Sequence, residues 1–191
     1  MSERFEKYGD FLRNELSGRS FRAQLAFGLS VADRLLGDYT AGVGEQAPER
    51  GARLGVALND LWSFVRDGSA GAPPYEGLAG AIREFYPGED DDLFYDSERE
   101  ALSGLNLLAT FAKDLKVRTL CHAAVAALEL IAEDFIERSS EPMITPELDA
   151  AAEHSEGVDA EMARQRSALD ALKAGVTDYD EVRQFEPLIE H

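Results

Sequence analysis

The side chains best suited to catalysis or metal binding are few and scattered along the chain. There is one cysteine, Cys121, and there are three histidines, His122, His154 and His191. Adjacent side chains on a helix point roughly 100° apart, so Cys121 and His122 cannot chelate one ion together. A nucleophile–base pairing of the thiol with His154 or His191 stays open, because such partners meet in space rather than in sequence. Cys121 is most simply a small core residue, and we predict no catalytic, cofactor-binding or metal-binding residue.

Carboxylates could do acid–base chemistry if the fold brought several of them together. Asp60, Asp96 and Glu100 could converge with Arg34 or His122 in a pocket between helices. Burial would raise the pKa of such carboxylates and fit them for proton transfer. This arrangement defines the alternative hypothesis, an enzyme or a small-ligand-binding protein.

Two short motifs resemble known binding loops only in part. Residues 42–47 (GVGEQA) match the dinucleotide-binding pattern G-x-G-x-x-G/A. That pattern needs a strand before it, whereas the preceding segment has helical spacing, so we interpret it as a turn between helices. Residues 89–92 (EDDD) lack the frame of a calcium loop, and a solvated turn is favoured there.

The overall charge excludes some classes of partner. The chain has 191 residues, with 19 Lys and Arg against 37 Asp and Glu, and a net charge of −18. Nucleic-acid binding depends on cations that neutralise phosphates, and anionic membranes also attract basic surfaces, so we expect neither partner. The first residues lack an apolar signal segment, and no apolar stretch approaches the roughly 18 residues that span a bilayer. A cytoplasmic protein is therefore expected.

The acidic charge is concentrated late in the chain. Residues 129–161 contain eleven acidic residues and one arginine. Glu129, Glu133 and Glu137 recur every four residues and share one helix face, and Glu141 continues that spacing. One interpretation is a solvated face; the other is a surface that meets a basic partner protein. We therefore favour a protein that acts through protein–protein contacts, either as a homo-oligomer or with a basic partner at this face.

Apolar residues spaced three and four apart predict helices along most of the chain. The first helix ends at Ser17 and Gly18, and a capping-box spacing of Ser97 and Glu100 opens the fifth. Phe135 is expected on the buried stripe of the sixth. The predicted later helices cover residues 21–39, 49–66, 75–85, 97–115, 117–135, 145–173 and 178–188.

These elements predict an all-α fold, because no alternating run typical of a strand occurs. We expect one bundle-like domain of seven or eight helices over residues 1–191. Residues 1–138 would form its main core. Residues 144–189 are thinly apolar and would pack more peripherally.

Three segments together resemble a known family. They are residues 27–39 (FGLSVADRLLGDY), 58–62 (LNDLW) and 101–111 (ALSGLNLLATF). In this pattern the chain resembles the bacterial domain of unknown function 416 (DUF416) family, the YjaG-like proteins. The resemblance implies an all-helical cytoplasmic protein without an established activity or cofactor, and it transfers no functional residue.

Overall fold

The computed structural model describes residues 2–43, 47–68, 71–86, 96–139, 143–173, 182–183 and 188. Within these ranges the chain forms α-helices and no strand, which confirms the predicted all-α class. There are eight such helices: α1 (Glu3–Ser17), α2 (Phe21–Val43), α3 (Pro48–Asp67), α4 (Tyr75–Phe85), α5 (Asp96–Asp114), α6 (Val117–Arg138), α7 (Pro146–Glu153) and α8 (Glu156–Lys173). None of the helices described combines the length and apolar character needed to cross a membrane.

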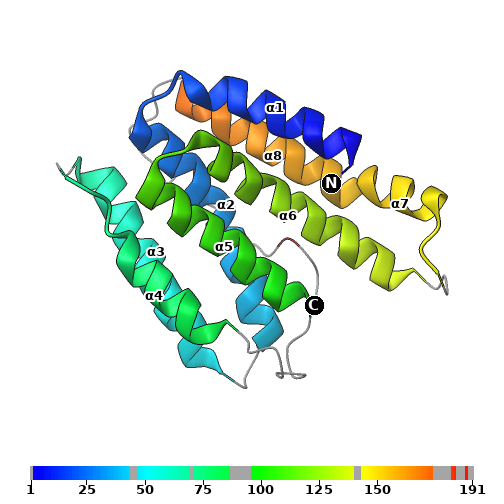
Figure 1. Cartoon of the computed structure of the whole chain (residues 1–191), viewed down its shortest axis with the longest axis horizontal. Helices are drawn as coiled ribbons and strands as arrows, with labels where there is room; N and C mark the ends of the chain where they lie inside the picture. Colours follow the sequence, from blue (N-terminus) through cyan, green and yellow to red (C-terminus); the bar gives the residue numbers. More distant parts are fainter. Residues whose placement is uncertain are drawn as a thin grey trace.

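Helices α2 and α6 lie at the centre of the bundle. Helix α2 contacts α3, α5, α6 and α8, and α6 contacts α1, α2, α5, α7 and α8. The α3–α4 pair lies on one side of α2 and α5, and α1 lies beside α8 on the other (Figure 1). Each of the eight helices contributes apolar side chains to one buried cluster. The extent of the domain, 1–191 with a main core over 1–138, stays a prediction.

Glycines let the central helices approach closely. A Cβ atom on Gly28 would lie 2.5 Å from Leu120 Cδ1 and 2.6 Å from Leu108 Cδ1. Gly104 of α5 meets α2 in the same way, since its Cβ would lie 2.6 Å from Leu35 Cδ1. Side chains at these two glycines would force the leucines of the neighbouring helices out of place.

Several helix termini follow from local chemistry. Ser2 and Thr145 cap α1 and α7, and each side chain accepts a hydrogen bond from a backbone N–H three residues later. Helix α3 ends at Gly68, whose φ of +69° lies in the left-handed region that glycine adopts readily. Helix α5 begins at Asp96, so Ser97 lies in its first turn and not at the predicted cap.

Three expectations about the later helices are wrong. The predicted helix over 145–173 is two helices, because Ser155 starts a new one: its Oγ accepts from the backbone N–H of Val158 at 3.4 Å. Residues 182, 183 and 188 of the predicted helix over 178–188 are not helical, and the other residues of that range lie outside the described part of the chain. Phe135 is 39% exposed, because it lies near the end of α6, beyond most of the buried stripe.

Candidate functional site

A hollow of about 270 Å³ lies between α6, α7 and the start of α1. Its walls combine acidic pairs with apolar and small residues: Ser2, Phe5, Glu129, Ala132, Glu133, Ile136, Asp149 and Glu153. Glu129 and Glu133 come from α6, whereas Asp149 and Glu153 come from α7. The members of each pair are four residues apart and share one face of their helix. Four carboxylates therefore line one small concave surface.

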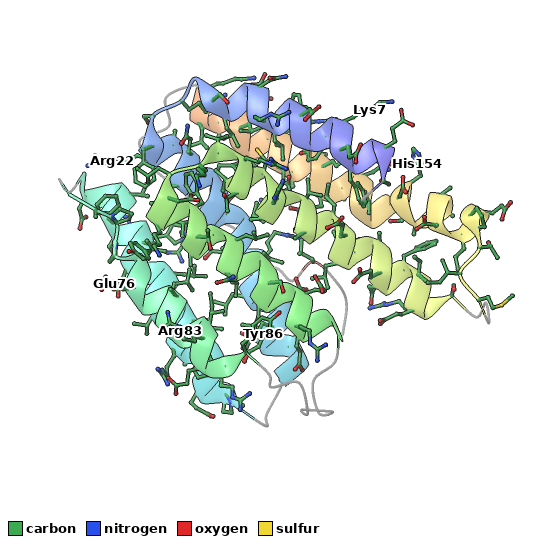
Figure 2. All side chains as sticks on the ribbon, in the orientation of Figure 1. Lys7, Arg22, Glu76, Arg83, Tyr86 and His154 are labelled. Atoms are coloured by element: carbon green, nitrogen blue, oxygen red, sulfur yellow. The ribbon has the colours of Figure 1, made fainter. Side chains whose placement is uncertain are left out.

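Two of the four carboxylates, those of Glu129 and Glu153, are half-buried, whereas Glu133 and Asp149 are exposed. Burial raises the pKa of Glu129, which is half-buried. Arg4 of α1 pairs with Asp159 and donates to the backbone oxygen of Glu153, beside the hollow. Lys7 points outward from α1, where it pairs with a glutamate of its own helix (Figure 2). A cation that entered the hollow would lie near several carboxylates, of which Glu129 is partly shielded from bulk water.

Only some residues of the predicted acidic face line this hollow. Glu129 and Glu133 line it, as their shared helix face allows. Glu137 is exposed on α6 but is not among the lining residues, and Glu141 lies outside the described residues. Sequence reasoning missed the acidic pair of α7, although its four-residue spacing after the cap Thr145 was a readable signal.

Several acids of the 129–161 segment are neutralised within the fold. Asp134 pairs with Arg138 at 2.8 Å, and Asp159 pairs with Arg4. Glu161 is 1% exposed, so it belongs to the interior and not to a surface. The sequence count of acidic residues therefore overstates the charge that a partner would meet.

Glu161 is the centre of a buried polar cluster that joins α2, α6 and α8. Its carboxylate lies 3.2 Å from Arg34 Nε and accepts two bonds from Arg164, at 2.7 and 2.5 Å. Gln165 Nε2 donates both to Glu161, at 2.8 Å, and to the backbone oxygen of Ala124, at 3.1 Å. The buried carboxylate of Glu161 is thus surrounded by donors from Arg34, Arg164 and Gln165.

A second buried acid, Asp33, lies one residue before Arg34 on α2. Its Oδ2 accepts from Trp62 Nε1 at 3.0 Å and from Arg183 Nε at 3.3 Å. Burial raises the pKa of Asp33 to about 6, although the positive charges of Arg183 and Arg164 act to lower it. Asp33 is thus a buried acid with a raised pKa that lies beside two cations, Arg183 and Arg164.

The structure does not bring Arg34, Asp60 and His122 of the alternative hypothesis together. Arg34 faces the interior, whereas Asp60 is exposed on α3. His122 is exposed on α6 and lines a different groove, of about 330 Å³, against α1. Glu100 is half-buried on α5, and the side chain of Asp96 lies outside the described residues.

Cys121 behaves as the predicted core residue. It is 3% exposed, and burial raises the pKa of its thiol to about 11. His154 ends α7 and is not among the residues that line the groove beside the thiol, and His191 lies outside the described residues. In the described ranges, no group of three or more His, Cys, Asp or Glu side chains could hold a metal ion.

The glycine pattern of residues 42–47 follows a helix. Helix α2 continues to Val43 and α3 begins at Pro48, so the pattern joins two helices as the sequence indicated. Residues 44–46 lie outside the described part of the chain.

The arrangement of helices is shared with a solved structure. No family model and no curated protein sequence matches this chain. The crystal structure of a DUF416 family protein from Shewanella baltica OS155 superposes with a TM-score of 0.69. The match covers 84% of this chain and 83% of that one, at 16% sequence identity. The resemblance noted from residues 27–39, 58–62 and 101–111 is confirmed for the fold, and the chain has the fold of a DUF416 family protein.

Proposed function

We propose that this protein acts through protein–protein contacts, and that the hollow between α6, α7 and α1 receives a lysine or arginine of a basic partner segment. The observation that carries the proposal is the set of four carboxylates around one concave surface: Glu129, Glu133, Asp149 and Glu153. A cytoplasmic location, expected from the sequence, belongs to the same proposal.

The electrostatics of the hollow favour such a partner. Like charges four residues apart on a helix are destabilising by about 0.2–0.5 kcal/mol a pair, and Asp149 and Glu153 of α7 form such a pair here. Exposed ion pairs contribute only about 0–1 kcal/mol, because water screens them. Half-buried Glu129 is screened less, so a cation beside it gains more and would lower the raised pKa of its carboxyl.

Apolar side chains near the same end of the molecule could add contact area. Met143 and Ile144 precede α7 and are 74% and 69% exposed. Phe135 of α6 is 39% exposed. A partner segment that alternates basic and apolar residues would therefore match this region better than a purely basic one.

A labelled peptide of alternating lysine and leucine residues tests the proposal by fluorescence anisotropy. We expect saturable binding that weakens as sodium chloride rises, because charges are screened beyond about 8 Å at physiological salt. Neutralising the hollow should weaken binding about tenfold or more, which corresponds to about 1.4 kcal/mol. This hollow variant carries Glu129→Gln, Glu133→Gln, Asp149→Asn and Glu153→Gln.

A matched variant distinguishes an effect of the hollow on binding from an effect of the overall net charge. It removes four exposed carboxylates from α3 and α4, namely Glu49, Asp60, Asp67 and Glu76, by the same Gln and Asn substitutions. Glu76 lies across the molecule from α7 (Figure 2). Both variants have the same net charge, so only the hollow variant should lose affinity. Equal losses in the two variants, or binding that ignores salt, would contradict the proposal.

Self-association is the other outcome that the sequence allowed. Sedimentation of the protein alone reveals it, and a dimer that the hollow substitutions leave intact would count against a role for the hollow in that contact. We do not propose an enzyme, because Arg34, Asp60 and His122 lie apart in the fold.

A further inference from the structure

Arg183, far along the chain, is held against the α2–α3 pair by three contacts of different kinds. Its Nε lies 3.3 Å from Asp33 Oδ2, and its Nη2 donates to Asn59 Oδ1 at 2.9 Å. Its guanidinium carbon lies 5.2 Å from the centre of the Trp62 ring. A carboxylate, an amide oxygen and an aromatic face are the groups that recognise a guanidinium ion.

The three recognising groups are positioned by helices rather than by the segment that carries Arg183. Asp33 lies on α2, and Asn59 and Trp62 lie one turn apart on α3. The indole N–H of Trp62 donates to Asp33 at 3.0 Å, and both side chains are almost fully buried, at 1% and 2% exposed. The packing of α2 on α3 therefore positions Asp33 and Trp62 independently of the segment that carries Arg183.

The segment that carries Arg183 is attached at few described points. Val182 is 2% exposed and joins the core. Further on, the backbone N–H of Leu188 donates to Asp38 Oδ1 at 2.8 Å, one turn of α2 beyond Arg34. Two acids of α2, Asp33 and Asp38, thus hold one late segment of the chain.

We propose that Asp33, Asn59 and Trp62 form a guanidinium-binding pocket, which the chain fills with its own Arg183 and which accepts another guanidinium group when Arg183 is displaced. A planar guanidinium bonds the carboxylate and the amide oxygen at once and stacks on the indole. An ammonium ion is a point charge and cannot make this combination. The pocket thus selects arginine side chains and small guanidinium compounds over lysine and amines.

The charges around Asp33 make the pocket dependent on pH. Arg183 and Arg164 of α8 face its carboxylate, and Trp62 donates to it. Removing Arg183 takes away one of these cations and leaves a buried acid less compensated. Without Arg183 the pKa of Asp33 rises further, so a guanidinium ion should bind the variant more tightly as the pH rises and Asp33 ionises.

The full-length Arg183→Ala variant tests the pocket directly. Trp62 is the only tryptophan of the chain, so its fluorescence reports on the site without a label. Titration with methylguanidinium chloride should give a saturable change, with affinity about tenfold higher than for methylammonium chloride at equal ionic strength. Wild-type protein should show no saturable change, because Arg183 occupies the site.

The double variant Arg183→Ala with Asp33→Asn is the control for the recognising acid, and it should lose the response. A response equal for both cations, or unchanged in the double variant, would overturn the proposal. If the single variant is unfolded, the same titration is followed by circular dichroism, because a ligand that binds only the folded state restores it. Methylguanidinium that fails to restore helicity would overturn the proposal equally.

Discussion

Replacing Asp33 by asparagine should remove a specific pH dependence from the stability of this protein. Asp33 is 2% exposed, and burial raises its pKa from 3.8 to about 6. Because the folded-state pKa lies above the unfolded-state value, the folded state binds the proton more tightly. Stability from this group is complete below about pH 4 and is lost as the pH rises towards about pH 6.

The size of the effect follows from the two pKa values. Their difference corresponds to about 3 kcal/mol over the whole range. About 1.4 kcal/mol of it falls between about pH 5 and about pH 7.5, by the same linkage relation. That window lies above the isoelectric point of 4.5, so the protein keeps a net negative charge throughout.

Urea unfolding followed by far-ultraviolet circular dichroism measures the effect. The stability of wild-type protein relative to Asp33→Asn should fall by about 1.4 kcal/mol across that window. Asparagine keeps an acceptor for the indole N–H of Trp62, so the comparison isolates the titrating proton. Asp60→Asn, an exposed control on α3, should give a difference that does not vary with pH. A flat difference for Asp33, or one of opposite sign, would refute the reasoning.

Three further substitutions and one thiol reaction test the packing of the helices. Gly28→Ala should destabilise by about 1–3 kcal/mol in urea unfolding, because its Cβ would lie 2.5 Å from Leu120 Cδ1. Gly80→Ala, with no atom within 4 Å of its Cβ, should be neutral or stabilising. Glu161→Gln should cost about 3–5 kcal/mol, because two guanidinium groups lose their buried carboxylate. Cys121 should react with a disulfide reagent only on unfolding; rapid labelling of native protein would contradict its burial.

The helices could be predicted because their apolar side chains recur at helical spacing over several turns. In α6 this spacing runs from Leu120 to Ile131, and those residues are buried. Prediction failed where a polar residue decided the outcome. Ser155 caps the start of α8, after α7 has ended at Glu153. The apolar residues on either side of Ser155 have a spacing that also fits one continuous helix, so the break was not predicted.

The polar interior could not be predicted, because its partners come from distant parts of the sequence. Asp33 and Arg183 are separated by 150 residues, and Ala124 and Gln165 by 41. No spacing rule connects such positions. The spacing of Glu129 and Glu133 placed them on one helix face, but no hollow was predicted there, because the packing of α7 across that face became visible only in the structure.

The most direct test of the account is to locate the basic peptide on the protein by amide chemical shifts. In a ¹⁵N-labelled sample, we predict that added lysine–leucine peptide shifts the resonances of residues 129–137 on α6 and of Pro146–Glu153 on α7, together with the start of α1. Residues of α3 and α4, which carry the control carboxylates, should stay unchanged. Shifts spread evenly over all acidic surfaces, or confined to α3 and α4, would contradict the claim that the hollow is the binding site.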